Sequence, residues 1–274
     1  MERIQQALNK AEEQRQKIVD SARPVVDSSR TDRGDAEDKD HSAITYSRTR
    51  TITVSPSTML ENRLVAGIKG HPQADIFRVL RTKIMYKMNQ AGINTIAVTS
   101  PNKGSGKSMV AANLAVSLSL EVNHTVLLVD MDLRRPSIHR YFGFQPEHGL
   151  ADHLSGDVEI SSLLVNPGIE RLVLLPSGNS IQHSSELIST PMMADLMEDI
   201  TTRYASRIII FDMPPLLHID DALIFLPKVQ SSLLVVEEGV STPAEVKESL
   251  RLLEHTNLLG TVYNKAQQHK HSPY

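Results

Sequence analysis

Residues Ser100–Ser108 (Ser-Pro-Asn-Lys-Gly-Ser-Gly-Lys-Ser) combine glycine, lysine and serine in an order suited to binding phosphate. They follow a short apolar run and precede a helical pattern, which predicts a loop between a strand and a helix. Gly104 and Gly106 can aim successive backbone N–H groups at one anion, and the N-terminus of the next helix adds a positive dipole end. Lys107 would reach the β- and γ-phosphates, and the Ser108 hydroxyl would ligate Mg²⁺. The loop therefore predicts binding of a nucleoside triphosphate with magnesium.

This loop departs from the strict pattern G-x-x-x-x-G-K-[ST] at its first position, where Pro101 stands. The alternative is a glycine-rich turn that matches the rest of the pattern by coincidence. We favour a P-loop because strand, loop and helix follow one another as that motif requires.

Three aspartates follow two other apolar runs. Asp130 and Asp132 come at the end of Val126–Asp132, and Asp212 ends the run Ile208–Asp212 before two prolines. Because the carboxyl ends of parallel strands meet at one edge of a sheet, we expect the three carboxylates to converge on Mg²⁺ and phosphate. Taken singly, each aspartate has the alternative role of a turn residue or helix cap.

Apolar runs alternate with helical patterns from about residue 92 onward. The predicted strands are Asn94–Thr99, Thr125–Asp130, Arg171–Pro176, Arg207–Asp212, Ser231–Glu237 and Leu258–Asn264. The predicted helices between them are Lys107–Leu120, Pro191–Tyr204 and Pro243–His255, the last with Thr242 as its N-cap. Continuous apolar runs suit strands covered on both faces, so the pattern predicts an α/β fold with a doubly wound, mostly parallel sheet and helices on both faces.

The composition divides the chain into four parts. Residues 1–20 predict a short amphipathic helix, which either frays or docks on a partner, and residues 21–60, rich in Ser, Asp, Arg, Thr and Pro, predict a flexible linker. Residues 61–266 contain the phosphate-binding pattern and its sheet, and residues 267–274 predict a mobile polar tail.

Several classes of protein are excluded by composition. The absence of cysteine removes disulfides, cysteine-ligated zinc, iron–sulfur clusters and thiol nucleophiles, and the net charge of −3 gives no global basic field for nucleic acid. No apolar run approaches the roughly 18 residues that span a bilayer, and the charged N-terminus is unlike a secretory signal, so we expect a cytoplasmic protein. The eleven histidines are too scattered to predict a metal site.

Taken together, these motifs resemble those of bacterial tyrosine autokinases of the exopolysaccharide and capsule type, within the P-loop class that also holds the MinD and ParA ATPases. The resemblance covers roughly Pro72–Lys265 and rests on the P-loop, the segment LLVDMDLRRP and the segment IIIFDMPP. Two further segments agree: PSGNSIQHSSELI, and the pair Asp221-Ala222 after the double proline. The partitioning ATPases carry a signature lysine where this chain has Asn102, so this position favours the kinase branch.

The resemblance implies phosphoryl transfer from MgATP to tyrosine. It assigns charge stabilisation to Lys107, metal binding to Ser108 and Asp132, a metal-bound water to Asp212, and orientation or deprotonation of the tyrosine to Asp130. Asn264, after the last predicted strand, would lie near the adenine; its alternative is an ordinary strand-ending residue. The predicted nucleotide-binding set is Asn102, Lys103, Gly104, Ser105, Gly106, Lys107, Ser108, Met109 and Asn264.

The resemblance also implies a homo-oligomer, either a ring or a dimer. Asp75, Arg78 and Arg81 lie at i, i+3 and i+6 of a predicted helix and would share one face, as in the family's Glu-x-x-Arg-x-x-Arg helix, which packs on a neighbouring subunit. Asp75 replaces the glutamate and shortens its reach by one methylene. The alternative is a solvated helix surface.

Further partners follow from the same resemblance: a separate inner-membrane chain-length regulator, which would hold the kinase peripherally at that membrane, and a phosphotyrosine phosphatase. The family usually ends in a cluster of tyrosines, whereas this chain ends in Tyr274 alone. Tyr274 is the phosphoacceptor candidate and Tyr46 a weaker one, while Tyr263 is placed in a buried strand. The lack of a tyrosine cluster in the tail favours the rival class, a ParA/MinD-type switch that hydrolyses ATP without phosphorylating protein.

Overall fold

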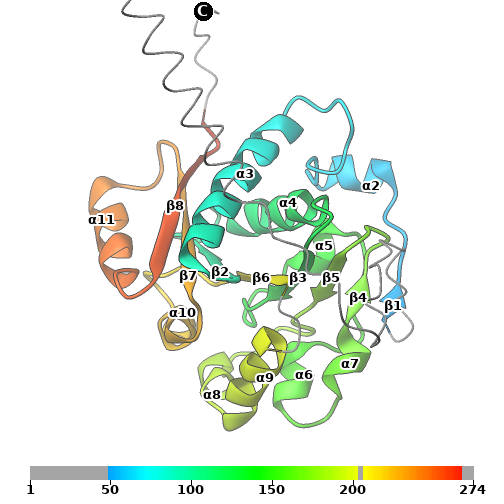
Figure 1. Ribbon diagram of the computed structural model, residues 1–274. Helices are drawn as coiled ribbons and strands as arrows, with labels where there is room; N and C mark the ends of the chain where they lie inside the picture. Colours follow the sequence, from blue (N-terminus) through cyan, green and yellow to red (C-terminus); the bar gives the residue numbers. More distant parts are fainter. Residues whose placement is uncertain (1–48, 203–205, 267–274) are drawn as a thin grey trace, which may run out of the picture. The chain divides into compact units, whose positions relative to one another are not determined.

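The computed structural model describes residues 49–202 and 206–266 (Figure 1). Their centre is an eight-stranded sheet in the order β1-β4-β5-β3-β6-β2-β7-β8, in which every pair is parallel except β4 with β5. The strands are β1 (Arg50–Thr51), β2 (Thr95–Thr99), β3 (Thr125–Asp130), β4 (Val165–Asn166), β5 (Leu172–Leu175), β6 (Arg207–Asp212), β7 (Ser231–Glu237) and β8 (Asn257–Asn264). The predicted doubly wound, mostly parallel fold is confirmed.

Helices cover both faces of this sheet. They are α2 (Pro56–Glu61), α3 (Ala74–Ala91), α4 (Lys107–Ser119), α5 (Ile138–Tyr141), α6 (Leu150–Leu154), α7 (Ile160–Leu163), α8 (Ser184–Ile188), α9 (Pro191–Thr202), α10 (Asp221–Phe225) and α11 (Pro243–Leu252), with a 3₁₀ turn at Leu226–Lys228. Helices α2 to α5 lie on one side and α6 to α10 on the other (Figure 1). None of the helices within these described ranges has the length and apolar character needed to cross a bilayer.

Alternate residues of each central strand enter two separate cores. In β3, Val126 and Leu128 pack with α3 and α4, whereas Leu127 and Val129 pack with α6 and α9 on the opposite face. This explains the continuous apolar runs, because a strand covered on both faces has no polar side to show in its sequence.

The final strand differs from the prediction of burial on both faces. β8 is an edge strand in which only Leu259 is buried, and Tyr263 is 59 % exposed. The prediction that Tyr263 lies in a buried strand is therefore wrong. The apolar run of β8 has the composition of a central strand, but its position at the edge leaves one side without a neighbour.

The predicted linker, residues 21–60, is wrong in its last part. Arg50 and Thr51 pair with β4, and α2 follows with Ser55 as its N-cap, whose hydroxyl accepts the Thr58 N–H at 3.1 Å. Met59 of α2 is buried in the core. The Ser, Thr and Pro residues taken for linker composition serve here to begin a short helix. The predicted helix 1–20, the rest of the linker and the predicted tail 267–274 lie outside the described residues.

A buried asparagine on α4 attaches the segment that follows α2. The Asn113 Oδ1 accepts the N–H groups of Val65 and Ala66 at 2.8 and 3.0 Å, and its Nδ2 donates to the carbonyls of Arg63 and Met109, both at 2.9 Å. The side chain and the residues Val65 and Ala66 are buried, so these two N–H groups have no access to water as a replacement.

We expect Asn113→Ala to lower the free energy of unfolding by about 3 kcal/mol, because two buried N–H groups lose their acceptor. Urea-induced unfolding of the two proteins measures the difference. The matched control is Asn89→Ala at an exposed position of α3, which should change the same quantity by less than about 0.5 kcal/mol. A loss below about 1 kcal/mol for Asn113→Ala would contradict this account of the attachment.

Candidate active site

The P-loop joins β2 to α4 at the carboxyl edge of the sheet. Gly104 and Gly106 have φ angles of 86° and 87°, in the left-handed region that glycine adopts without strain, and α4 begins at Lys107. The hydroxyls of Ser100 and Ser105 donate to the carbonyl of Asn102 at 2.7 and 3.0 Å. These two bonds hold the turn from inside and leave its outer N–H groups for an anion.

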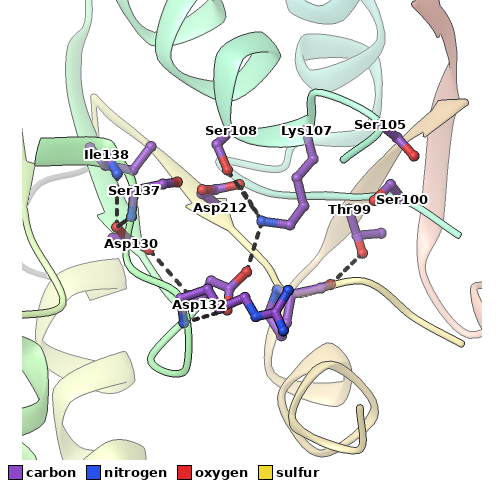
Figure 2. A network of polar contacts seen from close by, with 12 residues as sticks. Thr99, Ser100, Ser105, Lys107, Ser108, Asp130, Asp132, Ser137, Ile138 and Asp212 are labelled. Atoms are coloured by element: carbon purple, nitrogen blue, oxygen red, sulfur yellow. Dashed lines mark hydrogen bonds and ion pairs between the residues drawn. The ribbon is translucent and has the colours of Figure 1, made fainter. Parts of the chain in front are cut away.

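Lys107 meets two of the predicted carboxylates (Figure 2). Its Nζ lies 3.0 Å from Asp132 Oδ2 and 3.6 Å from Asp212 Oδ1, and it donates to the Ser108 hydroxyl at 3.2 Å. Asp132 follows β3 and Asp212 ends β6, and these strands are neighbours whose register pairs Asp130 with Asp212. Four predicted residues from three separate segments of the chain thus lie together at one edge of the sheet.

Burial controls the charges of this group. For Lys107, burial alone would lower the pKa, but Asp212 and Asp132 outweigh it and the pKa is raised, so the side chain is an ammonium at neutral pH. Burial raises the pKa of Asp212, while the Lys107 ammonium and the Ser108 hydroxyl oppose this rise. Lys107 is at ion-pair distance, and neither carboxylate oxygen accepts a hydrogen bond of normal geometry from the described residues. A buried carboxylate with unused lone pairs fits a position that would bind a cation or its water ligand.

The Asp130 carboxylate binds backbone N–H groups instead of facing Lys107, as Asp132 and Asp212 do. Its Oδ2 accepts the N–H groups of Ser137 and Ile138 at 2.8 and 2.9 Å, its Oδ1 accepts that of Asp132 at 3.3 Å, and the side chain is fully buried. Burial, then the nearby Asp212, raises the pKa of Asp130 to about 7. The carboxylate holds the turn after β3 in place, and it is Asp132 that faces the cavity.

A cavity of about 940 Å³ lies in front of Lys107. The P-loop, Asp132 and the segment after β6 line it, and Lys103 stands exposed at its edge. A second cavity of about 630 Å³ lies beside the P-loop and is lined by Gly104, Gly106, Met109 and Asn264 among others. The two cavities together offer space for a triphosphate and for a nucleoside on either side of one loop.

Asn264, at the end of β8, is in contact with the P-loop. Its Nδ2 donates to the Ser105 carbonyl at 2.8 Å, and a Cβ at position 106 would come within 2.2 Å of that nitrogen. Gly106 is therefore required here by close approach as well as by its φ angle. The Oδ1 of Asn264 is left to accept a hydrogen bond from a ligand in the second cavity.

The residues present suit magnesium together with phosphate. Ser108, Asp132 and Asp212 are oxygen ligands, and Mg²⁺ is usually held by one or two carboxylates, several waters and substrate phosphates. In the described ranges no group of three or more His, Cys, Asp or Glu could hold a metal ion by itself. The donor set is thus suited to a cation that arrives with a nucleotide.

Sequence reasoning missed several residues of this site. Arg135, Ser137, Tyr141 and His218 also line the larger cavity. Arg135 belongs to the quoted segment LLVDMDLRRP but was given no role, and no spacing rule marks the other three, because Ser137 and Tyr141 lie at and in the short helix α5 and His218 lies after β6, where tertiary contacts fix the path of the chain. Arg134, in the segment LLVDMDLRRP, instead turns away to pair with Asp221 at 3.1 Å.

The three residues predicted to form an oligomer face do not share it. Asp75 and Arg78 form an ion pair on the exposed side of α3. Arg81 turns toward α4, where it donates to the Ser117 carbonyl at 2.9 Å and pairs with Glu121 at 3.0 Å, and its side chain is only 17 % exposed. Within one molecule Arg81 thus points away from the exposed pair, because its long side chain reaches the C-terminal end of the neighbouring helix. That these three residues contact a neighbouring subunit stays a prediction.

Comparison with known proteins gives a consistent picture. The family model described as an AAA domain matches residues 93–236. The tyrosine-protein kinase YwqD of Bacillus subtilis is 32 % identical over 201 residues, which are 72 % of this chain and 83 % of that protein. The tyrosine-protein kinase etk of Escherichia coli K12 is 32 % identical over 189 residues, 68 % of this chain. The solved kinase domain of Escherichia coli tyrosine kinase ETK superposes with a TM-score of 0.70 at 28 % identity, covering 82 % of this chain and 91 % of that one.

The relatives differ in length. The chain spans only about a quarter of the length of several curated relatives, 26 % in the case of etk.

We expect the free energy of unfolding of the nucleotide-free protein to carry a contribution from Asp130 that falls as pH rises. The raised pKa means that the folded state binds a proton more tightly than the unfolded state, so stability is lost between pH 5 and pH 8, by about 2 kcal/mol. Asp130→Asn keeps an oxygen acceptor for the turn and should flatten this part of the profile. Urea unfolding at a series of pH values measures it, with Asp157→Asn at an exposed site as control. Equal slopes for wild type and Asp130→Asn would contradict it.

Proposed function

The chain belongs to the family of bacterial protein-tyrosine kinases built on a P-loop domain, and on this premise we propose that it transfers the γ-phosphoryl group of MgATP to tyrosine. The observation that carries the proposal is the meeting of Lys107 with Asp132, Asp212 and Ser108 in front of a cavity of about 940 Å³. Phosphoryl transfer depends mainly on positioning and charge stabilisation, and this group of residues supplies both.

Each residue has a role that follows from its placement. Lys107 would release its carboxylate partners in favour of the β- and γ-phosphoryl oxygens. Ser108 and Asp132 would hold Mg²⁺, with Asp212 bound through a water, and the ion would neutralise charge on the transferred group. Lys103, Gly104, Ser105 and Gly106 would contact phosphate through the loop, with Met109 and Asn264 beside the nucleoside.

Asp130 orients the site in this proposal. Its three backbone hydrogen bonds fix the turn that carries Asp132, and the carboxylate does not line the cavity. We therefore propose that Asp130 positions Asp132, and that a tyrosine enters the cavity between the turn after β3 and the segment after β6.

The acceptor would be a tyrosine of a neighbouring molecule. Tyr274 and Tyr46 lie outside the described residues, and the tail that carries Tyr274 starts close behind Asn264, which contacts the P-loop. Tyr263 becomes an additional candidate because its ring is exposed. A self-phosphorylating assembly would bring such residues to an adjacent cavity.

The rival function is an ATP-switched binding protein of the partitioning type. Asn102 stands where that class carries its signature lysine, and its amide is engaged within the chain by Glu245 and His218, both at 2.8 Å. Together with the kinases found at about 30 % identity, this supports the kinase.

The cellular setting is likewise proposed from family resemblance. It includes control of exopolysaccharide or capsule polymerisation or export, a homo-oligomer, a separate inner-membrane chain-length regulator that places the kinase peripherally at the membrane from the cytoplasm, and a phosphotyrosine phosphatase that reverses the modification.

Incubation with MgATP should add phosphoryl groups to tyrosine, seen as a gain in intact mass and located by peptide mapping. Lys107→Met should abolish the gain because no ammonium remains to stabilise the transferred group, while Lys228→Met, at an exposed position, should leave it unchanged. Tyr274→Phe should remove the modification from the tail. ATP turnover without any gain in mass would favour the switch and overturn the kinase.

Self-association should depend on the exposed pair on α3. Arg78→Glu places two acidic groups side by side and should weaken assembly about tenfold, measured by light scattering during gel filtration over a range of concentrations. Lys83→Glu on the same helix makes an equal change of charge and serves as control. An unchanged mass distribution for Arg78→Glu would exclude this face as the contact.

A further inference from the structure

Asn102 lies at the centre of a set of hydrogen bonds that join three segments around the larger cavity. Its Nδ2 donates to Glu245 Oε1 on α11 at 2.8 Å, and its Oδ1 lies 2.8 Å from His218 Nε2 in the segment after β6. Its backbone carbonyl accepts from Ser100 and Ser105 at the two ends of the loop. Every polar atom of the side chain is therefore engaged by a residue from another element.

The chemistry of the partners fixes the direction of these bonds. A carboxylate can only accept, so the Asn102 NH₂ group must face Glu245 and its Oδ1 must face His218. His218 then donates through Nε2–H and keeps an unprotonated Nδ1 when neutral. The chain Glu245, Asn102, His218 has one consistent arrangement of donors and acceptors.

Glu245 also makes hydrogen bonds within its own helix. Its Oε2 accepts the N–H and the hydroxyl of Thr242 at 2.8 and 2.9 Å, which closes the capping box of α11. Both carboxylate oxygens are thus used, one for the helix and one for the P-loop. The N-terminus of α11 becomes a fixed point to which the P-loop is attached.

His218 is tied to the P-loop by backbone bonds as well. Before it, the N–H groups of Leu216 and Leu217 donate to the carbonyls of Ser100 and Pro101 at 2.9 and 3.3 Å. His218 itself lines the same cavity as Lys107. The bond from His218 to the Asn102 side chain follows these two backbone bonds along the chain. Together the three bonds set the spacing between the P-loop and the segment after β6.

We propose that Asn102 is a positioning residue of the nucleotide site, and that its bonds to Glu245 and His218 preorganise the P-loop for phosphate. The proposal rests on the proposed function only in taking the cavity as a nucleotide site. Gly104 and Gly106 give the loop its shape but also the freedom to leave it, and a loop held before binding loses less conformational entropy when a ligand arrives. The affinity for nucleotide should therefore depend on Asn102 and Glu245 jointly.

Exchange of donor and acceptor tests this directly. Asn102→Asp keeps the shape of the side chain but sets two carboxylates against each other, and it should raise the Kd for MgADP about tenfold in isothermal titration calorimetry. Asn102→Asp combined with Glu245→Gln restores one donor and one acceptor and should return the Kd to within about threefold of wild type. Asn102→Ala should raise the Kd about fivefold by removing both bonds.

The matched control is Asn102→Asp combined with Glu248→Gln. Glu248 lies one turn further along α11 and pairs with Arg251, so this change should give no rescue. Thermal unfolding without nucleotide identifies a variant that fails to fold, in which case Asn102→Ala decides. A Kd unchanged by Asn102→Asp and Asn102→Ala, or a double variant no better than Asn102→Asp alone, overturns the proposal.

The outcome is separable from that of the kinase test. MgADP binding needs no phosphoryl transfer, so rescue of the Kd in a protein that gains no mass from MgATP would support the positioning role and reject the kinase. Tyrosine phosphorylation together with an unchanged Kd for the Asn102 variants would do the reverse.

Discussion

The ammonium group of Lys107 lies among the buried carboxylates of Asp132 and Asp212, with Asp130 behind them. One positive charge faces three acidic groups in a place where water gives little help, and burial raises the pKa of both Asp130 and Asp212 as a result. Removing the lysine from a buried group of this kind leaves its partners uncompensated. A divalent cation bound with a polyphosphate matches these charges, because the cation would balance the carboxylates and the phosphate would pair with the Lys107 ammonium.

That arrangement requires the sheet to be parallel at its centre. β3, β6 and β2 are adjacent, so the residues that follow them emerge at one edge, although Lys107 and Asp212 are more than a hundred positions apart in the chain. Both faces of these strands must be covered for the site to stay dry, and the two cores do this. The site therefore needs both the apolar strands, which build the two cores, and the polar residues that follow those strands.

The same reasoning shows which features the sequence could reveal. β3, β6 and β7 have the bounds predicted from their apolar runs. A strand that is buried on both faces has apolar residues at consecutive positions, so its ends are visible in the sequence. β1 and α2 were missed because a two-residue strand and a capped six-residue helix leave no periodic signal. Arg81 and Asn102 each bond to a residue on another element, and no local spacing records such a partner. Position in the sheet, not composition, decides that β8 is exposed while β7 is buried.

The P-loop is held from two sides, and the two attachments have different consequences. Asn264 binds the Ser105 carbonyl from the end of β8, where Lys265 also pairs with Glu237 of β7 at 2.7 Å. Asn102 binds Glu245 of α11 and His218 of the segment after β6. The first attachment joins the loop to the edge strand of the sheet. The second joins the loop to α11 and to the segment after β6, so it does not depend on the edge strand, and the loop keeps one attachment if the other is broken.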